Sequence, residues 1–185
     1  QVWYGENWEK ENNPEKYLKI LKEMLNGYRR LGITNLSAMY GEGWISENRI
    51  AYEILNAQGI RMIVWCTPDS ELEQNRKYLP NVKEEDYPII KIKEGSKQES
   101  GGRIDFFNHN AKVLIRNQKN DYFIKGMRGG MLGYSEQITE DDMYCNGITG
   151  KEMHNWGAYW YTKVYGEATR EIVDDDYIYY CREGC

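Results

Sequence analysis

Apolar residues recur every three or four positions near the N-terminus, which is the spacing of one face of a helix. They are Tyr17, Leu18, Leu21, Met24, Leu25, Tyr28 and Leu31. Asn13 and Pro14 precede this run as a typical helix start, and Gly32 follows it as a typical helix end. The pattern therefore predicts a helix over residues 14–31.

The next segment is typical of a strand, a helix and a second strand. A β-rich run at 33–40 ends at Gly41, and Ser46 then caps a helix that ends at Gly59. The run at 60–66 is almost continuously apolar, as in strands buried on both faces at the centre of an α/β sheet. A strand–helix–strand unit pairs its two strands in parallel.

The pattern changes after the polar, glycine-containing loop at 94–102. Short β-rich runs follow, with a hairpin turn at 117–120 between the last two. They span 103–108, 111–116 and 121–125. We expect the glycine-rich residues 126–133 to form a loop and residues 143–148 to form a last strand.

A helix is predicted to begin at Thr149, because Thr149 and Glu152 form a capping-box pattern. Its inner stripe consists of Met153, Trp156, Trp160 and Val164. Together the elements predict an α/β fold with a central mixed β-sheet flanked by helices on both faces. Parallel strands are expected to dominate the first half and antiparallel hairpins the second.

The chain is predicted to form one domain with two short flanking segments. The domain spans residues 14–166 and follows an aromatic N-terminal segment, residues 1–13, that contains Trp3, Tyr4 and Trp8. An acidic and aromatic tail with Cys181 and Cys185 spans residues 167–185.

Composition narrows the classes of function. The 185 residues carry a net charge of −5, which disfavours nucleic acid as a partner. No run approaches the roughly 18 apolar residues of a membrane span. The 16 Tyr and 6 Trp greatly exceed the 3 Phe, and such amphipathic aromatics suit interfaces with other protein subunits.

The number and spacing of the cysteines indicate whether the chain holds a metal and in which compartment it occurs. Cys66, Cys145, Cys181 and Cys185 show no Cys-x-x-Cys spacing, and the chain has only two histidines. We therefore predict no metal site and no cofactor. An even cysteine count, with Gln1 rather than Met at the start, favours an extracellular or otherwise oxidising compartment. The pairing of the cysteines stays open.

The stretch from Phe107 to Gly130 contains the residues most typical of chemistry. It reads FNHNAKVLIRNQKNDYFIKGMRGG, and it sets His109, Asn110 and Lys112 at the start of a predicted strand. It resembles the second half of a phospholipase D superfamily unit. That family carries His-x-Lys at a strand start, an Asp about four residues later and Gly-Ser-x-Asn after the next strand. The order of elements is similar over roughly residues 14–166.

The resemblance implies phosphate chemistry with a degenerate motif. In the family the His attacks phosphorus, Lys, Asn and Ser hold the phosphate oxygens, and a single-copy chain must dimerise. Here Lys112 matches, but Asn110 occupies the His position and His109 lies one residue earlier. Asn117 replaces the Asp, and Arg128 lies where Gly-Ser-x-Asn is expected. His109 and Lys112 point to opposite faces of a regular strand unless a β-bulge aligns them.

Three hypotheses follow. The favoured one is a catalytically degenerate phospholipase D-like domain that serves as a binding or assembly subunit, as a homo-oligomer or with other proteins. It would hold a phosphate-containing ligand through the anion-binding candidates Asn110, Lys112, Asn117 and Arg128. The second is an active homodimeric phosphodiesterase or nuclease that uses His109 and Lys112. The third is a secreted carbohydrate- or surface-binding module with an exposed aromatic platform.

Overall fold

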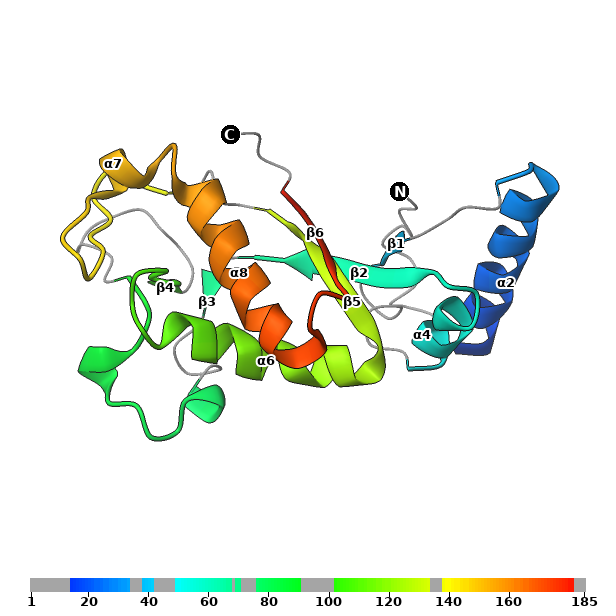
Figure 1. The fold of residues 1–185 in the computed structure, drawn as a ribbon, viewed down its shortest axis with the longest axis horizontal. Coiled ribbons are helices and arrows are strands. Elements are labelled where there is room, and N and C mark those ends of the chain that lie inside the picture. The colour runs from blue at the N-terminus through cyan, green and yellow to red at the C-terminus, as the bar shows by residue number, and fades with distance from the viewer. Residues whose placement is uncertain are drawn as a thin grey trace.

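A parallel sheet with helical connections organises the chain (Figure 1). The computed structural model describes residues 14–33, 38–41, 49–67, 69–70, 76–90, 102–133 and 138–181, so the predicted segment 1–13 lies outside the described residues. The elements are α2 (Pro14–Arg30), β1 (Ala38–Gly41), α4 (Arg49–Asn56), β2 (Arg61–Cys66), β3 (Asp69–Ser70), η1 (Arg76–Tyr78), η2 (Glu84–Asp86), β4 (Gly102–Arg103), α6 (Ala111–Lys125), β5 (Met127–Leu132), α7 (Gly150–Met153), α8 (Gly157–Val173) and β6 (Ile178–Cys181).

The first half of the chain confirms the predicted order of elements. The N-terminal helix is α2, and the predicted strand–helix–strand unit is β1, α4 and β2. β1 and β2 pair in parallel, with Ala38 opposite Arg61 and Gly41 opposite Val64. The capping signals and the apolar spacing agree in this region, which is why local sequence is sufficient there.

The α/β class is confirmed, but the sheet is not mixed. Among the described residues, the main sheet has four strands in the order β1-β2-β5-β6, and every neighbouring pair is parallel. The expected antiparallel hairpins of the second half are therefore wrong. The antiparallel pair β3–β4 lies in a separate two-stranded sheet. Because the strands neighbour one another in chain order, the sheet winds in one direction without reversal.

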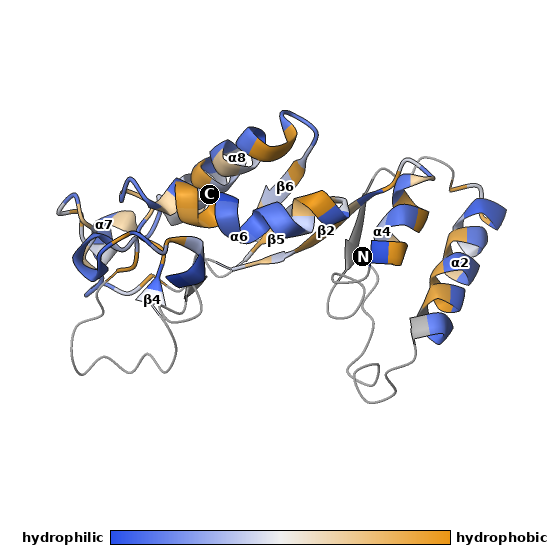
Figure 2. Cartoon of the chain, turned by 90° about the horizontal axis from the view of Figure 1, so that it is seen from below, coloured by the Kyte–Doolittle hydropathy of each residue, from blue (hydrophilic) through white to orange (hydrophobic). Residues whose placement is uncertain are grey.

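The helices pack against one face of this sheet. Buried residues of α2, α4, α6 and α8 belong to one core cluster with Met62, Val64 and Cys66 of β2. Figure 2 shows apolar and polar sides alternating along α2 and α4, as expected for helices that cover a core. α8 contacts α6, β5 and β6, and α4 contacts β2. The described helices thus do not flank both faces as predicted.

The opposite face of the sheet, called here the open face, has a different character. By strand alternation, its side chains include Arg61, Ile63, Trp65, Met131, Ile178 and Tyr180. Ile63 and Met131 form a small cluster of their own that contains no helix residue. Trp65, Ile178 and Tyr180 retain 38%, 36% and 37% of their surface exposed. No described helix residue joins this cluster, but Ile63 and Met131 are buried, at 6% and 7% exposure, so this face is covered in part.

Residues 111–125 form one helix, α6, so the two strands and the hairpin predicted there are wrong. The buried residues Ala111, Leu114, Ile115 and Phe123 fall on one helical face. The β-branched residues around Leu114 favour a strand locally, but burial of a complete helical stripe outweighs that propensity. Gly126 then ends the helix in the left-handed conformation, with φ of 116°.

The glycine-rich segment forms the inner strand β5 rather than the predicted loop. β5 lies between β2 and β6, and its register with β2 shifts between Met62 and Val64. Gly129 has a φ of 132°, and a Cβ there would overlap the backbone carbonyl of Ile178. Glycine therefore permits a close and irregular strand pairing that a side chain would block.

The C-terminal elements confirm one prediction and correct two others. The Thr149–Glu152 capping box is present at the start of α7. A turn at 154–156 separates α7 from α8, so Trp156 is 58% exposed instead of forming part of the core stripe. The predicted strand at 143–148 is also wrong, because its only pairing within the described part of the chain is an isolated bridge between Met143 and Thr149.

Candidate functional site

Two long connections meet beyond the same edge of the parallel sheet. One runs from the end of β2 to α6, and the other runs from the end of β5 to α8. Figure 1 shows β3, β4 and α7, which belong to these connections, gathered beyond one end of the sheet. In parallel α/β folds, the carboxyl ends of the strands and the connections that follow them build the binding sites.

A buried ion pair and a buried carboxylate tie the two connections together. Arg103 of β4 donates to Asp142 with an Nη1–Oδ2 distance of 2.9 Å. Asp105 accepts hydrogen bonds from the backbone N–H of Phe107 at 3.0 Å and of Cys145 at 2.7 Å. Arg103, Asp105 and Asp142 are each at most 4% exposed. These contacts fix the position of the β5–α8 connection against the turn that precedes α6.

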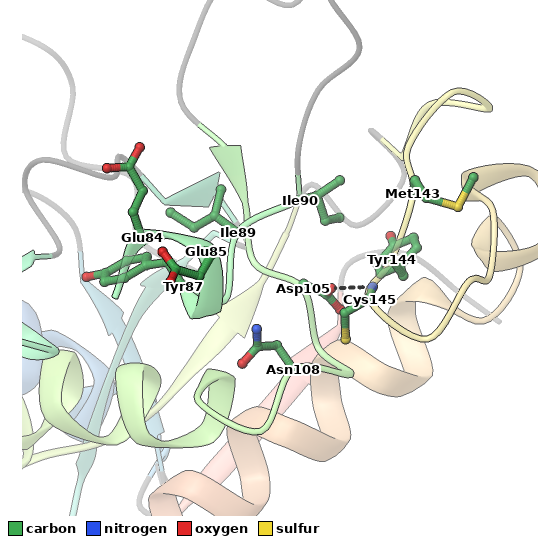
Figure 3. A pocket seen from close by; sticks show the side chains of 10 residues that line it. All are labelled: Glu84, Glu85, Tyr87, Ile89, Ile90, Asp105, Asn108, Met143, Tyr144 and Cys145. Carbon is green, nitrogen blue, oxygen red and sulfur yellow. Dashed lines mark hydrogen bonds between the residues drawn. The ribbon is translucent and has the colours of Figure 1, made fainter. Parts of the chain in front are cut away.

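A cavity of about 390 Å³ lies between the connections, and we call it the loop pocket. Figure 3 shows Glu84, Glu85 and Tyr87 on one side and Asp105, Met143, Tyr144 and Cys145 on the other. Its described lining residues are Glu84, Glu85, Tyr87, Ile89, Ile90, Asp105, Asn108, Met143, Tyr144 and Cys145. Carboxylates and an amide thus share the cavity with aliphatic and aromatic walls.

The charged side chains that line the loop pocket are all carboxylates. Glu84, Glu85 and Asp105 line it, and none of its described lining residues is a Lys or an Arg. Arg76 pairs with Glu84 at 3.0 Å, but Glu84 remains exposed. Asn108 donates its side-chain amide to the Asp86 carbonyl at 3.2 Å, which holds it at the cavity wall. Such a lining accepts hydrogen bonds from hydroxyl groups and repels a phosphate.

The Cys145 thiol and the Tyr144 phenol in the lining stay protonated at neutral pH. Burial, together with the hydrogen bond and negative charge of Asp105, raises the pKa of Cys145 to about 11. Burial and the neighbouring charge of Asp142 raise the pKa of Tyr144. A thiol needs to ionise to act as a nucleophile, so Cys145 does not supply a thiolate to this pocket at neutral pH.

The predicted anion-binding residues occur on separate elements with separate partners. Lys112, in the first turn of α6, forms an ion pair with Glu171 of α8 at 2.7 Å. Asn117, further along α6, donates to the Tyr78 carbonyl at 2.7 Å. Arg128 of β5 pairs with Asp176 at 3.1 Å. The contacts of these three side chains are thus ion pairs and hydrogen bonds between elements.

The remaining two candidates lie in the turn before α6. His109 is exposed, and Asn110 donates its side-chain amide to the Asp86 carbonyl at 3.1 Å. α6 begins at Ala111, so residues 110–111 contain no strand in which a bulge could align His109 with Lys112. Among the described residues, no hydrogen bond or ion pair joins any two of the five candidates. Their role in anion binding stays a prediction.

Sequence reasoning missed the loop pocket itself. Asp105 and Asn108 are only a few residues before the motif that drew attention, but Cys145 is 40 positions from Asp105. A buried acid followed by Asx-rich turn residues is a weak signal by itself.

Among the described residues, no group of three or more His, Cys, Asp or Glu side chains is suited to hold a metal ion. The described cysteines Cys66 and Cys145 are free thiols.

The fold is similar to that of several solved enzymes of glycoside hydrolase family 31 (GH31). A sulfoquinovosidase from E. rectale, solved with an aza-sugar inhibitor, superposes with a TM-score of 0.57 and 21% identity over 74% of this chain. A cycloalternan-forming enzyme from Listeria monocytogenes, solved with a pentasaccharide substrate, superposes with a TM-score of 0.66 and 15% identity over 89% of this chain. A dextranase from Flavobacterium johnsoniae, solved with glucose, superposes with a TM-score of 0.68 and 14% identity over 90% of this chain.

The likeness is one of fold. Identities of 14–21% are too low to carry activity, and the chain spans only 20–24% of the length of these three enzymes. No protein-family model and no curated protein matches the sequence. Among the described residues, no helix combines the length and the apolar character needed to cross a bilayer.

Proposed function

We propose that the chain binds carbohydrate in the loop pocket, at the carboxyl end of its parallel sheet. The observation that carries this proposal is the position of the pocket, which is built by the connections after β2 and β5. Ligand sites of singly wound parallel sheets lie at this edge. The third hypothesis from the sequence, a carbohydrate-binding module, is thus favoured over the first two.

The chemistry of the lining supports a sugar. A sugar presents hydroxyl groups around an apolar ring, so it needs carboxylate or amide partners next to aliphatic or aromatic walls. Glu85, Asp105 and Asn108 supply the polar partners, and Ile89 and Tyr144 supply apolar surface. A volume of about 390 Å³ lies in the range of small-ligand sites. The three carboxylates disfavour the phosphate-containing ligand that the sequence suggested.

The structural neighbours support the same class of ligand. Three proteins with this fold were solved with an aza-sugar inhibitor, a pentasaccharide substrate and glucose, respectively. Those ligands belong to those proteins, and the similarity to this chain is of fold alone. Combined with a polar pocket at the carboxyl edge, it makes a neutral glucose-type sugar the first ligand to examine.

Titration of the chain with glucose and isomaltotriose tests the proposal. Saturation-transfer NMR would detect weak binding, and calorimetry would give the affinity. We expect binding of isomaltotriose that Glu85→Ala weakens about tenfold, because one hydrogen bond to a charged group is lost. Glu85 is suited to removal, since its ion pair with Lys83 is long, at 3.9 Å.

Glu23→Ala provides the matched control. Glu23 pairs with Lys19 at the same 3.9 Å, and its side chain is 65% exposed, compared with 68% for Glu85. It lies on α2 and does not line the loop pocket. Equal loss of binding in both variants, or no binding of either sugar to the parent chain, would contradict the proposal.

A further inference from the structure

The start of α8 carries a second apolar stripe in addition to the one that faces the core. Trp156, Tyr159 and Trp160 are spaced three and four residues apart, so they lie on one side of the helix. Trp156 is 58% exposed and Tyr159 is 47% exposed. We call these three residues the aromatic row. The core-facing side of α8 is a different one, and its buried residues include Ala158, Tyr161, Val164, Tyr165 and Ala168.

Ring contacts join the aromatic row to the loop pocket. Tyr144, which lines the pocket (Figure 3), contacts Phe107 with ring centroids 5.6 Å apart. Phe107 contacts Trp160 at 4.8 Å, and Trp160 contacts Tyr159 at 5.5 Å. Trp156 follows at 6.0 Å from Tyr159, with the two rings nearly perpendicular. The series of rings is thus continuous from the wall of the pocket to the exposed end of the row.

The pocket wall and the aromatic row rest on the same packed cluster. Ile90, Tyr144 and Met153 form this cluster, and each is at most 3% exposed. Phe107 and Trp160 pack against it. Because Ile90 and Tyr144 also line the pocket, the pocket and the row are held in a fixed relation to each other. A ligand that contacts both therefore needs little ordering of the protein.

We propose that the aromatic row binds the further sugar units of an oligosaccharide whose first units occupy the loop pocket. This inference rests on the proposed function. A sugar ring has C–H groups on its faces and hydroxyl groups around its rim. A flat aromatic ring buries the apolar face and leaves the hydroxyl groups in water, and Trp and Tyr are the side chains suited to such half-exposed contacts.

The charges near the row favour a neutral oligosaccharide. Lys163 lies over the Trp160 ring at 4.8 Å and forms an ion pair with Glu167 at 3.4 Å. Its ammonium charge is therefore matched within its own helix. At the other end of the series, Glu85 and Asp105 line the loop pocket and would repel an acidic sugar. A neutral chain of several sugar units suits both ends.

The exposed area of the row favours a sugar over a protein partner. An aromatic side chain presents roughly 150–250 Å², so Trp156 and Tyr159, at about half exposure, together offer roughly 200 Å². A stable protein complex buries about 800 Å² on each partner. Two rings therefore supply only a small part of a protein interface, whereas they are sufficient to stack one or two sugar units.

Calorimetry with isomaltotriose and isomaltohexaose tests the inference. We expect the six-unit sugar to bind the parent chain about tenfold more tightly than the three-unit sugar, because the second contact is intramolecular once the pocket is filled. Trp156→Ala and Tyr159→Ala should each bring this ratio of affinities close to one and leave the affinity for isomaltotriose unchanged. Trp156→Phe keeps an aromatic ring and should retain most of the ratio.

Ile124→Ala is the matched control. Ile124 is a 74% exposed apolar residue near the end of α6, so it lies at the opposite edge of the sheet from the loop pocket. Its removal should leave the ratio of affinities unchanged. Glu85→Ala should lower both affinities and also keep the ratio, because Glu85 lines the pocket and not the row. Circular dichroism would confirm the helices of each variant, and Tyr159→Ala carries the test if Trp156→Ala does not fold.

Three results would overturn the inference. Equal affinities of the parent chain for the two sugars would remove the row and leave the loop-pocket proposal intact. Binding of isomaltohexaose that Trp156→Ala weakens and Glu85→Ala does not would contradict the loop-pocket proposal, and with it the link between the two surfaces. A mass of twice the 21.9 kDa chain in light scattering that Trp156→Ala reduces to one chain would show that a second copy, rather than a sugar, covers the row.

Discussion

The Arg103 guanidinium and the Asp142 carboxylate form an ion pair of 2.9 Å that is almost entirely buried, at 4% and 2% side-chain exposure. Asp142 also accepts hydrogen bonds from the backbone and the hydroxyl group of Thr139, at 3.0 and 2.7 Å. The carboxylate is therefore fully partnered inside the protein. This pair joins the β2–α6 connection to the β5–α8 connection, and the loop pocket lies between them.

Removal of one member of this pair should be costly. Asp142→Ala would leave the Arg103 charge buried without its partner, and we expect a loss of about 3–5 kcal/mol in the free energy of unfolding. Urea denaturation followed by circular dichroism measures it. Asp175→Ala is the control, because its pair with Arg170 is exposed at 78% and 58% and should contribute far less to stability. Similar losses in both variants would contradict the assignment.

The sequence predicted the first half of the fold because several local signals agree there. Pro14 and Gly32 bound a helix whose apolar spacing is regular, and the apolar run of β2 has no competing helical pattern. The second half failed where local and non-local effects differ. The apolar residues around Leu114 favour a strand by propensity, yet they bury one side of a helix.

The candidate site shows the same difference between local and non-local effects. Asp105 and Asn108 are close in sequence to the predicted motif, but their pocket depends on a backbone amide 40 residues later, at Cys145. Such a contact leaves no signal in the periodicity or the residue spacing of the sequence. Likewise, the pairing of β5 with β6 needs glycine at position 129, where a Cβ would overlap Ile178, and β6 follows β5 in the chain by more than 40 residues. Chain topology, rather than composition, decides both features.

Gly129 and Gly27 should respond in opposite directions to the same substitution. Gly129→Ala places a methyl group against the Ile178 carbonyl at a φ of 132°, so we expect a loss of about 3 kcal/mol or more. Gly27→Ala, in α2, meets no atom within 4 Å and should gain about 0.5–1 kcal/mol from helix propensity. Thermal unfolding measures both, and a tolerated Gly129→Ala would argue against the register of β5 with β6.

The reactivity of Cys145 should follow its raised pKa. Because the thiol keeps its proton up to a pH of about 11, we expect iodoacetamide to modify it slowly at pH 8. For a group whose pKa is raised by folding, the free energy of unfolding falls as the pH rises from the pKa of the unfolded chain to the pKa of the folded chain. Here that window runs from about 9 to about 11. Peptide mapping by mass spectrometry isolates this cysteine from the other three.

Asp105→Asn tests the cause of that shift. The substitution removes the negative charge while keeping an oxygen that accepts the backbone N–H of Cys145. Burial would still raise the pKa of Cys145, but the total rise would be smaller without the negative charge of Asp105. Alkylation at pH 8 should therefore become faster. Unchanged alkylation would show that Asp105 does not act on the thiol, and the electrostatic description of the loop pocket would need revision.

A phosphodiester assay separates the sugar proposal from the phospholipase D-like hypotheses. We expect the chain to leave bis-p-nitrophenyl phosphate unhydrolysed, and His109→Ala to change nothing, because His109 is exposed and Lys112 is paired with Glu171 at 2.7 Å. Lys112→Met should instead lower stability only slightly, as expected for a half-exposed ion pair. Hydrolysis by the parent chain that His109→Ala abolishes would restore the phosphodiesterase hypothesis, since the attacking imidazole would then be identified directly.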